Sequence, residues 1–323
     1  MIKLVNINEN SGIPLVGSIA FGVIDRGSNV IEVRPTTLCN LNCLFCSTGS
    51  GINPVSRDVN YEVEVNYLLR WVKEIVEFKG EGVEAHIDSV GEPAVYKDIV
   101  RLVKGIKTMP NIKSISMQSN GTLLDRSLVD KLKKAGLSRI NLSIHSLNED
   151  LSKKLSGVGC YDIKKVIKNI KYIAKSKINL LLAVVYLPGI NDNDVEDLIK
   201  FAKDIKCNIC LQKYSPYKHG RKLKIKNLNW YQFYNKVKTL SKKYDINLAG
   251  SDDMVFEKRE SLPIVFKKNE KVYVDIKAPG WLKEQMLGVA KNRVIMIDNC
   301  HKKLNDRVRV EIFENKNNLY LAK

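Results

Sequence analysis

Strand-like and helix-like segments alternate along most of this 323-residue sequence. Short runs rich in valine, isoleucine and leucine are typical of buried strands, and longer runs between them have apolar residues at helical spacing. Repeated strand and helix units predict a parallel sheet with right-handed crossovers. The six strand-like runs are residues 29–34, 83–88, 112–118, 140–144, 178–186 and 207–214. The helix-like runs are residues 61–78, 96–107, 125–134, 162–175, 192–205 and 229–244.

Three cysteines, Cys39, Cys43 and Cys46, follow the first of these strands within eight residues. Thiolates are suited to iron-sulfur clusters, zinc or Cu(I). A structural zinc site or an electron-transfer cluster takes four protein ligands, so three thiolates leave one metal position open for a small molecule. A zinc knuckle with a distant fourth ligand, histidine or cysteine, is the alternative interpretation.

The spacing C-x3-C-x2-C, with Phe45 before the last cysteine and Asn40-Leu41-Asn42 after the first, resembles the cluster loop of the radical S-adenosylmethionine (SAM) superfamily. The resemblance implies a 4Fe-4S cluster on Cys39, Cys43 and Cys46, with SAM on the fourth iron and Phe45 beside the cofactor. An external one-electron donor would reduce the cluster, and SAM would be cleaved to a 5'-deoxyadenosyl radical. The six units resemble the open (β/α)6 barrel of this family.

Residues at the ends of the predicted strands carry the rest of the resemblance, because parallel barrels place functional groups there. Gly91-Glu92-Pro93 resembles the family's Gly-Gly-Glu-Pro motif, with Val90 in place of the first glycine. By this resemblance Gly91 and Glu92 hold the amino group of SAM. A simple turn before the helix is the structural alternative.

The next three strand ends offer further candidates. Ser119 and Asn120 lie in a turn similar to the family's Thr-Asn-Gly turn, which implies contacts to the ribose of SAM. Ser143 matches a family serine near SAM, and His145 stands where an acidic residue is frequent. His145 is therefore the candidate acid, base or substrate contact. Residues 188–192, Pro-Gly-Ile-Asn-Asp, resemble another turn of the superfamily.

The charge balance favours a polyanionic partner. There are 53 basic and 35 acidic residues, for a net charge of +18, although a lysine-rich composition can have other origins. Residues 213–226 contain six basic residues, two tyrosines and no acidic residue. Basic groups between stacking rings suit single-stranded RNA, and a solvated loop is the alternative. The candidate RNA contacts are Lys213, Tyr214, Tyr217, Lys218, Arg221 and Lys222.

Short strand-like runs replace the alternating pattern after residue 263. Their number and spacing predict a small closed β-barrel. The segment resembles a TRAM domain, a small RNA-binding barrel attached to several RNA-modifying enzymes, although residues 305–306 lack the glycine often found there. The expected fold class is α/β: a partial (β/α)6 radical SAM barrel with an N-terminal hairpin at 1–250, a linker at 251–262, and a TRAM-like all-β barrel at 263–323. The short strands are residues 271–276, 285–289, 293–297, 307–312 and 318–321.

Four further cysteines, Cys160, Cys207, Cys210 and Cys300, are poor candidates for a second cluster, because positions three apart on a strand face opposite sides. No apolar run approaches the roughly 18 residues of a membrane span, and the N-terminus does not resemble a signal peptide. We therefore expect a cytoplasmic protein that does not bind a membrane.

These patterns predict a radical SAM enzyme that modifies RNA, with tRNA as the first candidate. One alternative keeps the radical chemistry and assigns it a peptide, protein or small-molecule substrate. The other is a non-enzymatic RNA-binding protein with a structural metal. The sequence does not indicate which nucleotide is modified or which bond is made.

Overall fold

The structure is a computed structural model that describes residues 2–250 and 256–323. Its contacts divide the chain into two compact units. The first unit comprises residues 1–38, 56–115 and 256–323, and the second comprises residues 39–55 and 116–255. The predicted domain boundary at 251–262 stays a prediction, and residues 251–255 of that linker lie outside the described part.

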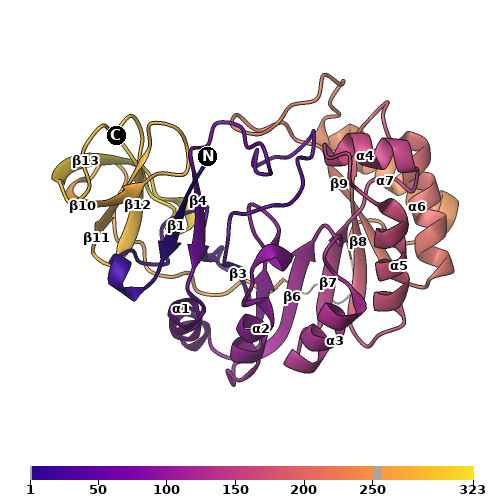
Figure 1. Cartoon of the computed structure of the whole chain (residues 1–323), viewed down its shortest axis with the longest axis horizontal. Coiled ribbons are helices and arrows are strands. Elements are labelled where there is room, and N and C mark those ends of the chain that lie inside the picture. Colours follow the sequence, from indigo (N-terminus) through magenta and orange to yellow (C-terminus); the bar gives the residue numbers. More distant parts are fainter. Residues whose placement is uncertain (1, 251–255) are drawn as a thin grey trace. The chain divides into compact units, whose positions relative to one another are not determined.

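The first unit begins the main sheet. Strands β2 (Gly22–Asp25) and β3 (Val30–Arg34) form the predicted antiparallel hairpin. Strand β5 (Val83–Ile87) pairs parallel with β3, and β6 (Ile112–Ser119) runs from the first unit into the second. The crossover helices are α1 (Val65–Lys79) and α2 (Ile99–Lys107), both visible in Figure 1. The order of strands in the sheet is β2-β3-β5-β6-β7-β8-β9.

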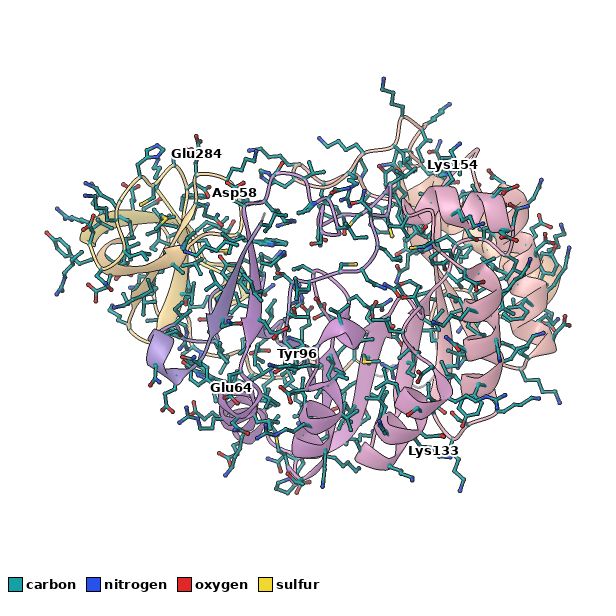
Figure 2. The ribbon with its side chains drawn as sticks, viewed as in Figure 1. Asp58, Glu64, Tyr96, Lys133, Lys154 and Glu284 are labelled. Atoms are coloured by element: carbon teal, nitrogen blue, oxygen red, sulfur yellow. The ribbon has the colours of Figure 1, made fainter. Side chains whose placement is uncertain are left out.

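A two-stranded parallel pair, β1 (Lys3–Ile7) with β4 (Val59–Val63), was not predicted. Strand β4 occupies the residues where a helix was expected to begin at 61. The helix starts instead after Glu64, whose carboxylate accepts hydrogen bonds from the backbone N–H groups of residues 66 and 67. The Tyr96 hydroxyl donates to the Val63 carbonyl at 2.6 Å and fixes the end of β4 (Figure 2). Short 3-10 helices lie at Glu9–Ser11, Pro93–Val95 and Lys316–Asn318.

The second unit continues the sheet with parallel strands and helices in alternation, as predicted. Strands β7, β8 and β9 follow β6, and each pairs parallel with its predecessor. Helix α4 was not predicted, because it has only eight residues and most of them are polar. No helix in the described ranges is both long enough and apolar enough to cross a membrane. The elements are β7 (Arg139–Ser143), β8 (Asn179–Tyr186), β9 (Asn208–Lys213), α3 (Arg126–Ala135), α4 (Glu149–Ser156), α5 (Ile163–Ala174), α6 (Asp192–Asp204) and α7 (Trp230–Tyr244).

The C-terminal segment forms a closed five-stranded barrel in the order β10-β11-β12-β14-β13, drawn in yellow in Figure 1. This confirms the predicted small barrel. Alternate residues of β10 point into its core, among them Val274 and Ile276. The TRAM assignment itself stays a prediction. The strands are β10 (Lys271–Pro279), β11 (Met286–Ala290), β12 (Arg293–Ile297), β13 (Arg307–Glu314) and β14 (Leu321–Ala322).

The barrel packs against the N-terminal part of its own unit. The Val294 N–H donates to the Val16 carbonyl at 2.9 Å, and the Tyr61 hydroxyl donates to the Pro279 carbonyl at 2.7 Å. Gly17 has a φ of 125°, and a Cβ on it would lie 2.1 Å from the Val294 carbonyl oxygen. The close backbone approach therefore requires glycine at this position.

A buried ion pair joins three parts of the first unit. The Lys79 ammonium at the end of α1 lies 2.8 Å from the Asp25 carboxylate, and both side chains are at most 1% exposed. Asp25 also accepts hydrogen bonds from the backbone N–H groups of Gly27 and Leu262 at 2.8 and 2.7 Å. One carboxylate thus ties the hairpin and α1 to the segment that precedes the barrel.

We predict that Asp25→Ala lowers the free energy of unfolding by about 3–5 kcal/mol, because it leaves the Lys79 ammonium buried without its counter-charge. Glu77→Ala is the control, since its pair with Lys73 is 59–65% exposed and contributes about 0.5 kcal/mol or less. Urea unfolding followed by circular dichroism measures both. Equal shifts in the two variants would show that the buried pair has no special role.

Candidate active site

The three clustered cysteines lie in an irregular loop, residues 39–55, in the second unit. Cys39, Cys43 and Cys46 are partly exposed. The end of α4 binds the loop backbone: Asn42 N–H donates to the carbonyl of residue 156 at 2.9 Å, and Leu44 N–H donates to that of residue 155 at 3.0 Å. The cysteines are therefore presented by a loop whose backbone is held on both sides of Cys43.

Arg221, which is 178 residues from Cys43 in the sequence, also holds this loop. Its guanidinium donates to the carbonyls of Cys43 at 3.3 Å, Ser50 at 2.6 Å and Asn53 at 2.6 Å, and to the side-chain oxygen of Asn42. Its backbone N–H donates to the carbonyl of residue 46 at 2.8 Å. Arginine has five N–H donors in a fixed geometry, which suits several carbonyls of one loop.

The basic loop at residues 213–226 consequently packs onto the cysteine loop, and two of its candidate RNA contacts differ from expectation. Tyr214 is buried beside Phe45, and its hydroxyl accepts a hydrogen bond from Leu223 N–H at 2.9 Å. The Arg221 guanidinium is taken up by loop carbonyls. Burial and hydrogen bonding give both side chains structural partners, which the local charge pattern could not reveal. Tyr217, Lys218 and Lys222 are exposed, and Lys213 is partly buried.

The environment of Cys43 is suited to a cationic ligand. Burial, followed by the neighbouring thiols Cys39 and Cys46, raises the pKa of Cys43 to about 12, while the Arg221 charge opposes the rise. The thiol is protonated at neutral pH, and a metal that binds it must displace the proton. Within the described residues, no three histidine, cysteine or carboxylate side chains surround a point that could hold one metal ion. A 4Fe-4S cluster does not require such a single point, because each thiolate binds a different iron of the cluster.

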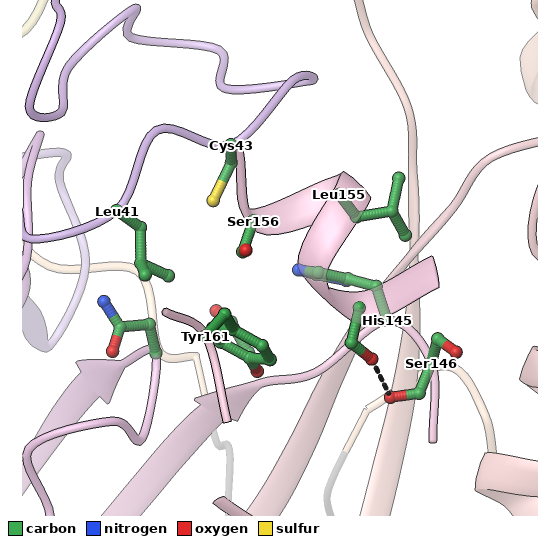
Figure 3. Close-up of a pocket in the computed structure, with 10 residues that line it drawn as sticks. Leu41, Cys43, His145, Ser146, Leu155, Ser156 and Tyr161 are labelled. Atoms are coloured by element: carbon green, nitrogen blue, oxygen red, sulfur yellow. Dashed lines mark hydrogen bonds between the residues drawn. The ribbon is translucent and has the colours of Figure 1, made fainter. Parts of the chain in front are cut away.

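A small cavity beside the loop brings four predicted site residues together: Cys43, Asn120, Ser143 and His145. Figure 3 shows the Cys43 sulfur and the His145 ring facing the same space, which Tyr161 closes from another side. The cavity volume is about 50 Å³. It can hold a few water molecules.

His145 is positioned by the strand after its own. Ile144 N–H bonds to the carbonyl of residue 183 in β8, and His145 Nδ1 accepts a hydrogen bond from Val185 N–H at 3.1 Å. Since Nδ1 is an acceptor, the proton of the neutral ring lies on Nε2. Burial lowers the pKa of His145 to about 4, so the ring is neutral at pH 7. Its ring also meets Phe45 edge to face, with centroids 4.7 Å apart.

Asn191 is a positioning residue that sequence reasoning missed. Its side chain is fully buried and donates to the carbonyls of His145 and Val185, each at 3.0 Å. Its amide oxygen accepts a hydrogen bond from Leu187 N–H at 2.8 Å. The signal that could have identified it was the Pro-Gly-Ile-Asn-Asp turn at residues 188–192. Asn191 holds the strand ends of β7 and β8 together.

The serine and asparagine candidates lie at the ends of β6 and β7. Asn120 donates to the Asn40 side chain at 2.9 Å, and Asn40 donates to the Thr122 hydroxyl at 2.8 Å, so this turn is joined to the cysteine loop. The Ser119 hydroxyl accepts a hydrogen bond from the N–H of residue 121 at 3.1 Å. The Ser143 hydroxyl accepts one from the side-chain amide of Gln118 at 2.8 Å and lines the cavity.

Gly91 and Glu92 lie in the first unit and contact Leu38, the residue before Cys39 in the sequence. Glu92 N–H donates to the Leu38 carbonyl at 2.7 Å, and a Cβ on Gly91 would lie 2.1 Å from that carbonyl oxygen. The Glu92 carboxylate is buried and accepts a hydrogen bond from Ala94 N–H at 3.0 Å, which caps a short 3-10 helix. The motif therefore has a structural role in its own unit.

The remaining cysteines are dispersed. Cys210 is buried in β9 and packs against residues 181 and 183, and burial raises the pKa of Cys207 to about 12. Cys160 is exposed, and Cys300 packs against the core of the C-terminal barrel in the other unit.

Comparisons with known proteins agree with the site. Residues 33–202 match the model of the Radical SAM superfamily. The chain is 38% identical over 351 residues to the uncharacterized protein MJ0103 of Methanocaldococcus jannaschii, covering 99% of this chain and 80% of that protein. It is 33% identical over 199 residues to the GTP 3',8-cyclase of Clostridium botulinum, covering 61% of this chain and 60% of the cyclase.

Among solved structures, Streptococcus suis SuiB bound to S-adenosylmethionine has the same fold. The TM-score is 0.54 at 22% identity, over 69% of this chain and 49% of SuiB. The chain thus spans about half of SuiB and less than two thirds of the cyclase.

We predict that alanine at Cys39, Cys43 or Cys46 abolishes cluster assembly, because each thiolate would bind a different iron. Iron content after anaerobic reconstitution and 5'-deoxyadenosine formation under dithionite measure the effect. Cys160→Ala is the matched control, since this thiol is exposed and lies outside the loop. If 5'-deoxyadenosine persisted in all three loop variants, the assignment would be wrong.

We predict that Arg221→Gln lowers the iron retained after reconstitution severalfold, because carbonyls of the cysteine loop lose their charged donor. Chelator challenge, with release of iron followed over time, is the measurement. Lys222→Gln, at the exposed neighbouring position, should release iron at the wild-type rate. Equal rates for Arg221→Gln and wild type would remove Arg221 from the support of the loop.

Proposed function

Because this chain belongs to the Radical SAM superfamily, we propose that it is an enzyme that modifies RNA, with tRNA as the first candidate. Enzymes of this superfamily use a 4Fe-4S cluster and SAM. The donor set fits such a cluster, since three cysteines lie on one loop whose backbone is held by Arg221 and by the end of α4. When bound, the cluster supplies the electron that cleaves SAM to a 5'-deoxyadenosyl radical.

The observation that carries the RNA proposal is the attachment of the basic loop to the cysteine loop. Arg221 bonds to the loop carbonyls, while its neighbours Lys218 and Lys222 and the ring of Tyr217, 57% exposed, remain available. A Cβ on Gly220 would lie 2.5 Å from the carbonyl oxygen of residue 47. The exposed basic groups are therefore within three residues of direct contacts to the cysteine loop. A phosphate backbone bound there would bring nucleotides to the chemistry.

The C-terminal barrel gives independent support. Tyr273 on β10 is 59% exposed and pairs across the strands with Arg309, and the Arg307 guanidinium carbon lies 5.8 Å from the Tyr273 ring centroid. An exposed ring between two arginines suits a stacked base. Asp275 and Glu311 on the same face limit its positive charge, so the ring rather than net charge is the attractive feature.

We assign roles to the site residues within this proposal. Gly91, Glu92, Ser119, Asn120 and Ser143 bind SAM, and Phe45 packs beside the cofactor. His145 is the candidate catalytic residue: its Nε2–H is a hydrogen-bond donor beside the cavity, while its Nδ1 is already bonded to Val185 N–H. The reaction needs an external one-electron donor, and we place the protein in the cytoplasm.

A small nucleotide is the second candidate substrate. The identity with GTP 3',8-cyclase covers 61% of this chain, which favours a purine nucleotide within the small-molecule alternative. Both candidates are anions with a base and a sugar, so the basic loop serves either. They differ in length, and a longer chain makes more phosphate contacts, so the salt dependence of binding distinguishes the two candidates.

We predict that Lys218→Glu combined with Lys222→Glu weakens binding of tRNA to the full chain. Each lost phosphate contact should reduce the slope of log affinity against log salt by about 0.7 to 0.9. Lys133→Glu with Lys134→Glu on α3 is the matched control, with the same change in charge at exposed positions. Filter binding across a salt series measures the slopes.

Cells with and without the gene provide the chemical test, in which RNA nucleosides are compared by mass. Loss of one modified nucleoside is the expected result. An unchanged set of nucleosides, together with salt-insensitive binding of RNA, would contradict the proposal and leave the small nucleotide as the substrate.

A further inference from the structure

Helix α7 exposes a cluster of aromatic rings at its first turns that the proposed function does not use. Trp230 is 58% exposed, Tyr231 is 76% exposed and Tyr234 is 59% exposed. The helix packs on its own unit through a different set of side chains, Phe233, Val237 and Leu240. The rings of Trp230 and Tyr234 are stacked, with centroids 5.7 Å apart and planes at 26°. Large rings left in water in a stacked pair indicate a binding surface.

The segment of sequence that carries this ring pair has charges of one sign. Residues 213–244 contain ten lysines and arginines and no aspartate or glutamate. The Lys213 ammonium lies 5.4 Å from the Trp230 ring centroid, and it donates to the Asn227 side chain at 3.4 Å. Lys236, one turn into the helix, is partly buried with its ammonium 5.8 Å from the ring centroid of Tyr186. The Lys213 ammonium and the Trp230 ring therefore lie together in the second unit.

The position of this surface along the chain links it to the cysteine loop. Arg221 is bonded to that loop, and Trp230 lies nine positions after Arg221 in the sequence. The intervening residues include Lys222, Lys224 and Lys226, all of which are exposed. A continuous basic segment thus leads from the ring pair to the cysteine loop within one compact unit.

We propose that Trp230 and Tyr234 stack unpaired bases of an RNA strand whose phosphates lie along the basic segment 213–226. This inference rests on the proposed function and names the surface on which the substrate would be held. Base stacking on aromatic rings tolerates any sequence, and basic side chains beside the rings neutralise the backbone. An acidic protein is the competing occupant. Residues 213–244 contain no aspartate or glutamate, which argues against a protein interface of mixed charge and against readout of base sequence by acidic side chains.

The test measures binding of a fluorescein-labelled, single-stranded oligouridine to the reconstituted full chain by anisotropy. Trp230→Ala and Tyr234→Ala should each weaken binding by about fivefold to a hundredfold, the range seen when one stacking ring is removed. The salt slope should stay at the wild-type value, because no phosphate contact is lost. Phe78→Ala is the matched control: this ring is exposed on helix α1 of the other unit, and its loss should leave affinity unchanged.

A second variant separates stacking from folding. Trp230→Phe keeps a stacking ring, so it should bind oligouridine within a fewfold of wild type. It should also lose the RNA-induced quenching of tryptophan fluorescence that we expect for wild type. Thermal unfolding midpoints should be equal for wild type and all ring variants.

The outcomes distinguish this inference from the proposed function. If wild type binds RNA in a salt-sensitive manner and both alanine variants bind as tightly, the inference is overturned and the proposed function stands. If wild type shows no salt-sensitive RNA binding, both fail. If the alanine variants slow reduction by an acidic electron-transfer protein while RNA affinity is unchanged, the surface binds a protein and the inference is overturned.

Discussion

The hydrogen bonds of Arg221 are the constraint on which the rest of the site depends. Residues 39–55 have no helix or strand to satisfy their backbone groups, yet the cysteines must be presented in a fixed order. One guanidinium supplies donors to carbonyls of three loop residues and to the Asn42 side chain. Carbonyls at the end of α4 accept hydrogen bonds from the N–H groups of Asn42 and Leu44. The loop is thereby shaped by partners that belong to the same compact unit.

Pairing of adjacent parallel strands explains how His145 and Ser143 reach the cavity. Ser143 is the last residue of β7 and pairs with residue 183 of β8. Strand β8 continues beyond this pair, so that Val185 N–H donates to the His145 ring. Asn191 then closes the turn after β8 by binding the carbonyls of both strand ends. A parallel sheet brings successive strand ends to one edge, so short polar turns can build a single site.

Arg221 joins the cysteine loop to the loop that carries the proposed partner surface, so the proposal implies that substrate binding acts on the cysteine loop. Binding of a polyanion to Lys218 or Lys222 would act directly on residues adjacent to Arg221. Because Arg221 also lowers the otherwise raised pKa of Cys43, its position affects the ionisation of that thiol. One side chain therefore connects support of the loop with its electrostatics.

Sequence by itself determined the elements whose signals are local. The strand predicted at 293–297 is β12 to the residue, and the parallel strands and crossover helices lie within a few residues of their predicted bounds, because apolar periodicity is set by neighbours along the chain. The cysteine spacing is local too. Only the tertiary structure decided that Arg221 and Tyr214 support the cysteine loop, that Asn191 positions His145, and that β1 pairs with β4. Arg221 and Cys43 are 178 residues apart, and no local pattern specifies which buried carbonyl a distant side chain will satisfy.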